Sequence, residues 1–442
     1  MASIAQKALF GWKDVEKLGD LRRLQLVLRY LPDEKLMRVL EAERDKGSDD
    51  YPVRPTWNSI LGGVVYQHES IQSLRRELQR NAQLRELCGF DVLLGLDAVP
   101  TPWAYSRFLA NLFRHAGQVQ AIFDELVDLL KEELPDFGRY QAFDGKAIAS
   151  YANGKKKEEE ANPKAGRRRD GDADWGKHVS KGKRKDGTAW EKVKLWFGYG
   201  LHMIVDARYE LPIGFEVTKA SGAEAPMMHT LFERERERHP ELIDRCKYGI
   251  GDRGYDDGKL ISRHWDDWGI KSVIDIRDLW KDGEETKQID GKWNVVYDYR
   301  GTVSCICPKT GEQRKMPLGG FEAKRGTLKY RCPAHQYGID CAGSKDCPVG
   351  KALRIPLSED RRVFTPLARS SYRWAEVYRM RTAVERVNSR IDNVFGFEKH
   401  YIRGQQKMKV RVSVALCVML AMALGRIKEK QKELMRSLVR VA

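Results

Sequence analysis

The first third of the chain repeats apolar residues with the period of an α-helix. Apolar side chains recur at intervals of three and four over residues 21–30 and 36–44, which places them along one face of a helix. Thr101 followed by Pro102 suits the N-cap and first position of another helix. The pattern therefore predicts a helical domain over residues 1–135.

Beyond residue 135 the pattern changes to short apolar runs separated by Gly, Pro and charged residues. These runs predict strands over residues 140–143, 194–199, 201–205, 213–218, 248–251 and 272–276. Helical patterns between and after them cover residues 226–238, 259–268 and 374–395. Alternating strands and helices of this kind predict a mixed α/β core.

Two segments differ from this alternating pattern of strands and helices. Residues 155–194 hold 14 Lys and Arg against 8 Asp and Glu, with few aliphatic residues, and we expect a basic loop that is either simply solvated or in contact with phosphates. Residues 279–355 form a cysteine-containing insertion. The expected organisation is a helical domain (1–135), the first part of the core (136–278), the insertion (279–355), and the end of the core with basic C-terminal helices (356–442).

The charge balance indicates the kind of partner. The 442 residues include 79 Lys and Arg against 63 Asp and Glu, for a net charge of +16. An excess of this size favours a polyanion, with DNA or RNA first. The alternative is a basic protein without such a partner.

The chain carries no pattern that sends it to a membrane or out of the cell. Residues 1–7 lead into mixed polar sequence without the features of a signal peptide, so we expect a cytoplasmic protein with reduced thiols. The longest apolar stretch, residues 412–424, is shorter than a bilayer span and is flanked by cations. We expect it to form a buried core helix, and we expect no membrane partner.

Three carboxylates stand in separate short motifs. Asp144 and Asp252 each follow a short apolar strand-like run, so neighbouring parallel strands would bring them together at strand ends. Tyr378, Arg381 and Glu385 are spaced three and four apart, which aligns them on one stripe of a helix. Converging carboxylates suit Mg²⁺ or Mn²⁺ ions that act on phosphodiesters. The alternative for Glu385 is an ordinary surface Arg–Glu pair.

The helical motif resembles the Tyr-(2)-Arg-(3)-Glu-(6)-Lys signature of a superfamily of DDE transposases of bacterial insertion sequences. Tyr378, Arg381 and Glu385 match its first three positions with the same spacing. The lysine expected seven residues after Glu385 is Asp392 here. Arg390 is a poor substitute, because residues two apart on a helix point in different directions.

Asp144 and Asp252 resemble the first and second Asp motifs of the same family. The resemblance implies a ribonuclease H-like mixed sheet with flanking helices. It implies that Asp144, Asp252 and Glu385 are the catalytic residues and hold two Mg²⁺ or Mn²⁺ ions. It also implies that the DNA-contacting residues include Tyr378, Arg381 and Arg253.

The activity that this resemblance implies is cleavage of DNA at the ends of an insertion sequence, followed by joining to target DNA. Joining two ends implies a homodimer or larger assembly on DNA. One alternative is a non-catalytic, sequence-specific DNA-binding protein derived from a transposase. Another is a hydrolytic nuclease that cuts but never joins.

The insertion holds five of the eight cysteines, between Cys305 and Cys347. Spaced cysteines next to Pro and Gly suit a structural zinc site, and the expected ligands are Cys307, Cys332, Cys341 and Cys347. Cys305 or His335 could replace one of them. The alternative is a group of free thiols in a β-rich insertion.

Overall fold

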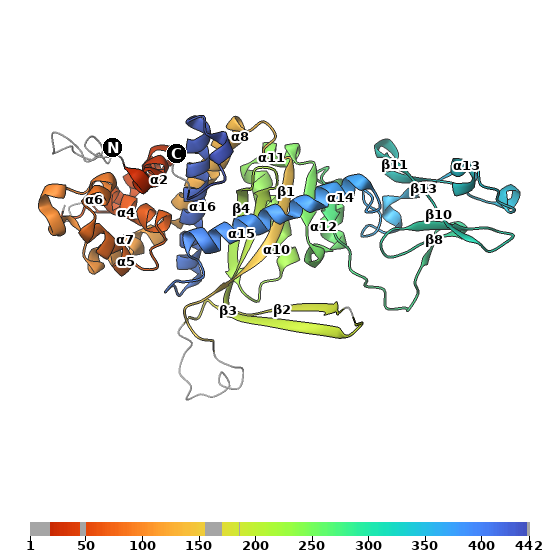
Figure 1. Cartoon of the computed structure of the whole chain (residues 1–442), viewed down its shortest axis with the longest axis horizontal. Helices are drawn as coiled ribbons and strands as arrows, with labels where there is room; N and C mark the ends of the chain where they lie inside the picture. The colour runs from red at the N-terminus through yellow and green to blue at the C-terminus, as the bar shows by residue number, and fades with distance from the viewer. Residues whose placement is uncertain (1–17, 45–49, 155–169, 185, 440–442) are drawn as a thin grey trace.

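The computed structural model describes residues 18–44, 50–154, 170–184 and 186–439. The molecule is elongated, with N-terminal helices at one end, a mixed sheet with its helices in the middle, and a β-rich insertion at the other end (Figure 1). The three parts are therefore arranged in a row.

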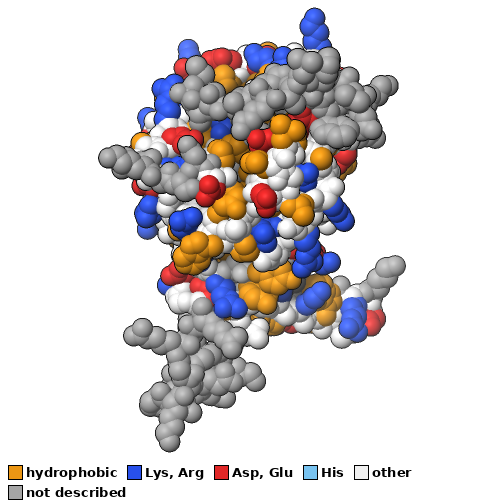
Figure 2. Space-filling view, turned by 90° about the vertical axis from the view of Figure 1, so that its left-hand side faces the viewer, with side chains coloured by type: hydrophobic (Ala, Val, Ile, Leu, Met, Phe, Trp, Pro, Cys, Tyr) orange, Lys and Arg blue, Asp and Glu red, His pale blue; other side chains and the backbone are white. Residues whose placement is uncertain are grey.

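The N-terminal part is helical. Its helices are α2 (Arg22–Tyr30), α3 (Glu34–Arg44), α4 (Val53–Val65), α5 (Ile71–Arg80), α6 (Ala82–Cys88), α7 (Pro102–Arg114) and α8 (Ala116–Glu133). Thr101 caps α7 as expected, because its hydroxyl accepts a hydrogen bond from the Ala104 amide at 3.1 Å. Figure 2 views this end of the molecule, where basic side chains lie along the edges and hydrophobic side chains are exposed between them.

The central sheet is mixed. Its strands are β1 (Tyr140–Ala149), β2 (Asp174–Lys183), β3 (Ala189–Asp206), β4 (Leu211–Lys219), β5 (Tyr248–Gly251) and β6 (Lys271–Ile274). The order β4-β3-β1-β5-β6 combines antiparallel β4, β3 and β1 with parallel β1, β5 and β6. The expected ribonuclease H-like mixed sheet is confirmed.

Helices cover both faces of this sheet. Phe143 on β1 packs against Phe232 of α10 (Glu224–Arg238) and His264 of α12 (Gly258–Asp266). Lys146 projects from the opposite face of the same strand. There it pairs with Asp392 of α15 (Thr382–Phe395), which covers that face. A short helix, α11 (Pro240–Arg245), leads into β5.

The apolar stretch near the C-terminus lies in α16 (Gln405–Lys428), which packs against α2, α8 and β4. Within the described part of the chain it is the one helix long and apolar enough to cross a membrane, and 89% of its apolar window is buried in protein. The expected buried core helix is therefore present. It joins the N-terminal helices and the sheet into one hydrophobic core.

The insertion has a core of its own. One sheet contains β7 (Lys287–Ile289), β8 (Lys292–Tyr297), β9 (Val303–Ile306) and β10 (Gln313–Lys315), and a second contains β11 (Leu318–Glu322), β12 (Thr327–Arg331) and β13 (Ala352–Pro356). A short helix, α13 (Pro333–Tyr337), follows β12. The chain then returns to the central sheet through α14 (Tyr372–Tyr378).

Two expectations about local structure need correction. Of the basic loop expected over residues 155–194, residues 174–183 and 189–194 instead belong to the antiparallel strands β2 and β3, where Trp and Val stand among the charged residues and favour extended backbone. Residues 155–169 lie outside the described part. The helix expected over residues 374–395 is divided by a 3-10 turn, Arg379–Arg381, between α14 and α15.

Candidate active site

Strand pairing brings Asp144 and Asp252 together. β1 and β5 run parallel, with Ala142 opposite Ile250, so the two acids follow at matching positions. Asp144 Oδ1 accepts a hydrogen bond from the Gly145 amide at 2.9 Å, and Asp252 Oδ1 accepts one from Gly254 at 2.6 Å. These backbone bonds fix the carboxylates at the edge where β5 ends.

The two carboxylates repel each other. Burial, and then the Asp252 carboxylate, raise the pKa of Asp144 from 3.8 to about 7. Such a pair is unfavourable when both members are ionised and nothing positive lies between them. A divalent cation would relieve this repulsion, so the donors fit a Mg²⁺ or Mn²⁺ ion with hard oxygen ligands.

Glu385 lies on the first turn of α15, and about half of its side chain is exposed (49%). Its Oε1 forms an ion pair with Arg381 Nη1 at 2.8 Å. The Arg381 guanidinium lies 6.0 Å from the centre of the Tyr378 ring, which stacks on Trp374. The stripe that the spacing predicts is therefore present, although a 3-10 turn lies inside it.

Arg381 connects the helix to the strand acids, because it is close enough to Asp144 to interact with its charge. Glu385 itself is held by Arg381. Among the described residues, no three His, Cys, Asp or Glu side chains are close enough together to hold a metal ion. The structure thus assembles Asp144 with Asp252, but it does not bring Glu385 into a finished ligand set.

A fourth carboxylate, which the sequence patterns did not single out, lies beside the strand acids. Glu224 is the first residue of α10. A Cβ built on Gly145 would lie 2.8 Å from its Oε1, and one on Gly254 would lie 3.5 Å from its Oε2. Desolvation and the Asp252 charge raise the pKa of Glu224. Its only sequence signal is a Glu at a helix start, two residues after a glycine.

Asp392, the residue in place of the signature lysine, has a partner that explains it. Its Oδ2 pairs with Lys146 Nζ at 2.5 Å, with both side chains largely buried (14% and 21% exposed). Lys146 lies two residues after Asp144 on the same side of β1. In this chain the strand therefore supplies the lysine, Lys146, and the helix carries the acid, Asp392, at the signature position.

Arg253, expected to contact DNA, is exposed but already paired. Its Nε and Nη2 donate to Asp275 Oδ2 at 2.9 and 2.5 Å. Asp275 directly follows β6, so this pair connects the Asp252 motif to the next strand. In the structure Arg253 braces the loop that carries Asp252.

The cysteines of the insertion approach one another only partly. Cys307 Sγ and Cys341 Sγ lie 3.8 Å apart, close to the separation of about 3.8 Å that two sulfurs adopt on one zinc ion. A hydrogen bond from Thr310 lowers the pKa of Cys307 to about 6. Cys332 and Cys347 lie within electrostatic reach of Cys305. As with the acids, the described residues contain no assembled group of three metal-binding side chains.

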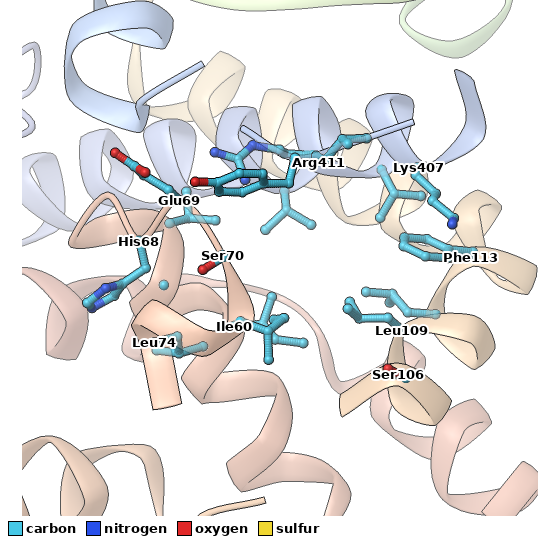
Figure 3. Close-up of a pocket in the computed structure, with 18 of the residues that line it drawn as sticks. Ile60, His68, Glu69, Ser70, Leu74, Ser106, Leu109, Phe113, Lys407 and Arg411 are labelled. Atoms are coloured by element: carbon cyan, nitrogen blue, oxygen red, sulfur yellow. The ribbon is translucent and has the colours of Figure 1, made fainter. Parts of the chain in front are cut away.

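A cavity of about 580 Å³ lies away from these acids, between α4, α5, α7 and α16 (Figure 3). Ile60, Leu109 and Phe113 supply apolar walls, while Lys407 and Arg411 of α16 supply cations. None of the three expected catalytic acids lines it. The candidate site lies instead at the edge of the sheet, where Asp144 and Asp252 are partly buried.

Comparison with known families identifies the class of protein. The family model of the transposase DDE domain matches residues 163–421, which is more than half of the chain. This protein belongs to the transposase DDE domain family. The match includes Asp252 and Glu385, whereas Asp144 lies before its first residue. Searches of curated proteins and of solved structures found no match.

Proposed function

We propose that this protein is an active transposase that cuts DNA at the ends of an insertion sequence and joins those ends to target DNA. The observation that carries the proposal is the parallel pairing of β1 and β5, which places Asp144 beside Asp252 in a chain of this family. The net charge of +16 favours the DNA partner.

The roles of the acids follow from their positions. Asp144 and Asp252 would hold Mg²⁺ or Mn²⁺ from the sheet, and Glu385 would complete the ligand set when it leaves Arg381. Two such ions, when bound, supply activation of the attacking oxygen and stabilisation of the leaving oxygen. Arg381, once released from Glu385, is free to bind a phosphate.

The proposed DNA contacts differ in how directly they can form. Tyr378 is within electrostatic reach of Asp252 and Arg381 within reach of Asp144, which supports both as contacts to DNA bound at these acids. Arg253 would first have to share or leave Asp275. Joining two DNA ends requires two active sites, so we propose a dimer or larger assembly on DNA.

The decisive experiment uses a donor plasmid that carries the DNA flanking this gene. With Mg²⁺ or Mn²⁺ we expect cleavage by the parent protein and none by Asp144→Asn or Glu385→Gln. Glu376→Gln, an exposed change on α14, serves as the control. Cleavage that survives either catalytic change would overturn the proposal.

A second substrate separates the alternatives. A precleaved end with a free 3′-hydroxyl tests joining alone. Cutting without joining would identify a hydrolytic nuclease, and DNA binding without any metal-dependent chemistry would identify a non-catalytic DNA-binding protein. The transposase proposal requires both cutting and joining.

We also propose a structural zinc ion in the insertion, bound by Cys307, Cys332, Cys341 and Cys347. The support is the 3.8 Å approach of the Cys307 and Cys341 sulfurs and the packing of Cys332 and Cys347 against the small separate core of the insertion. Purified protein should contain about one zinc per chain. Cys307→Ser should lose it, whereas Cys246→Ser, in the central core, should retain it. A parent protein free of zinc would refute the site.

A further inference from the structure

The hairpin of β2 and β3 extends beyond the central sheet. We define the β2–β3 arm as residues 174–198, in which β2 pairs with the first half of β3 from Asp174 opposite Gly198 to Lys183 opposite Ala189. In Figure 1 it projects from the body as a long two-stranded arm. Its sequence contains seven Lys and Arg and three Asp and Glu. Within the part of the chain that the structure describes, the arm is therefore a basic ribbon without a second layer of structure packed on it.

The pairing register assigns side chains to two faces of the arm. Directly opposed residues of an antiparallel pair lie on the same face. The inner face, as we name it, comprises Asp174, Gly176, His178, Gly182, Trp190, Lys192, Lys194 and Trp196. The outer face comprises Trp175, Lys177, Val179, Ala189, Glu191, Val193, Leu195 and Phe197.

The inner face is turned toward the carboxylates. Asp174 Oδ2 accepts a hydrogen bond from Ser221 Oγ at 2.9 Å, just before α10. Farther along the arm, His178 lies within electrostatic reach of Glu224. Glu224 in turn borders Asp144 and Asp252. DNA bound at these acids would therefore have the inner face beside it.

The inner face combines cations with an exposed indole. Lys192 and Lys194 are exposed. Between them and the tip, the Trp190 ring lies over Gly182, since a Cβ on that glycine would be 2.7 Å from indole atoms. Trp190 is 39% exposed. A ring held against a glycine and open on its other side is suited to stacking on a base.

We propose that the inner face of the β2–β3 arm binds the DNA strand that leaves the carboxylate site. Lys192 and Lys194 bind its backbone phosphates, and Trp190 stacks on an unpaired base. A two-stranded ribbon is narrow enough to follow a DNA groove, and paired cations on one edge match the repeating phosphate charge. The assignment rests on the proposed function, because that function places DNA at the acids.

Binding without metal tests the lysines separately from catalysis. The probe is a labelled duplex of about 30 base pairs in EDTA, titrated with full-length protein at several salt concentrations. Lys192→Glu and Lys194→Glu should each weaken binding about tenfold and lower the salt slope by about 1. Lys177→Glu on the outer face is the matched control, with an expected change below about twofold.

The indole is tested with the same duplex carrying a single-stranded overhang. We expect the overhang to increase the affinity of the parent protein. Trp190→Ala should reduce affinity for the overhang duplex about tenfold and leave binding to the blunt duplex unchanged. Trp190→Phe should retain most of the affinity that the overhang adds. Equal losses for Lys177→Glu and the two inner-face changes, or no effect of Trp190→Ala, would overturn the assignment.

The outcomes also separate this assignment from the proposed function. Protein that binds through the inner face but never cuts DNA would refute the transposase activity and leave the arm's role intact. Protein that cuts and joins DNA with unchanged binding by all the arm variants would refute the arm's role alone.

Discussion

The carboxylates reach the candidate site in two different ways. Asp144 and Asp252 stand on paired parallel strands, and each accepts a hydrogen bond from a nearby backbone amide. Glu385 stands on an exposed helical turn and is held by Arg381. The strand pair is in place without a ligand, whereas under the proposed function the helical acid has to leave Arg381 to reach a metal ion.

Because of this difference, we expect the strand acids and Glu385 to contribute differently to metal binding. A fixed pair of like charges stores repulsion that a cation can relieve, so the strand acids should govern metal affinity. An acid that must leave an arginine contributes less to metal affinity, because breaking the ion pair offsets part of the new bond. The proposed exchange would release Arg381 at the same time, which would couple completion of the metal site to phosphate binding.

The largest expected effect is on metal affinity. Asp252→Asn should weaken Mn²⁺ binding in the absence of DNA by about 100-fold or more, which corresponds to about 3 kcal/mol. Glu385→Gln should weaken it by less than about tenfold, although it abolishes cleavage. Calorimetric titration measures both, with Glu376→Gln as the control. Equal losses at Asp252 and Glu385 would show that the helical acid is as well placed as the strand pair.

The next effect separates binding from chemistry at Arg381. Arg381→Met frees Glu385, so Mn²⁺ affinity should stay the same or rise about twofold, while cleavage falls about 100-fold because the guanidinium that binds the phosphate is gone. Arg379→Met, in the same 3-10 turn, should change neither. A fall in Mn²⁺ affinity with Arg381→Met would mean that Arg381 positions Glu385 as a ligand instead of competing for it.

Asp252 directly follows β5, as the apolar run before it predicts. Asp144 also follows an apolar run, but the strand continues past it to Ala149, so Asp144 lies within β1 and the expected strand end at Asp144 was wrong. The Tyr378–Arg381–Glu385 stripe could be found because helical spacing is local. Glu224 and Lys146 could not, since their importance depends on which elements pack together: Glu224 fits beside Gly145 and Gly254 only after α10 docks. The β2–β3 arm was not predicted, because a segment with this many charged residues has the composition of a solvated loop. Its strand structure depends on the pairing of β2 with β3.

A moderate effect is expected where the helix meets the strand. The Lys146–Asp392 pair should set the register of α15 against β1, so Asp392→Asn should lower cleavage about tenfold and stability by about 1–2 kcal/mol. The exchanged pair, Lys146→Glu with Asp392→Lys, should recover most of both losses and restores a lysine at the signature position. Cleavage rates and urea denaturation measure the cycle. No recovery in the exchanged pair would show that the two residues act independently.

The smallest expected effect is the pH dependence of the metal-free protein. Burial and the Asp252 charge raise the pKa of Asp144 to about 7, whereas its ordinary value is 3.8. Between pH 3.8 and pH 7, the folded protein therefore keeps a proton on Asp144 that the unfolded chain has released. The stability that this proton contributes is lost as the pH rises toward 7. In EDTA, the Tm of the parent protein, measured relative to the Tm of Asp144→Asn, should fall by a few degrees between pH 5 and pH 8. Excess Mg²⁺ should reverse the shift at the upper end, because the ion replaces the proton between the carboxylates. A difference in Tm that stays constant with pH would mean that Asp144 ionises normally and that the strand pair stores no repulsion.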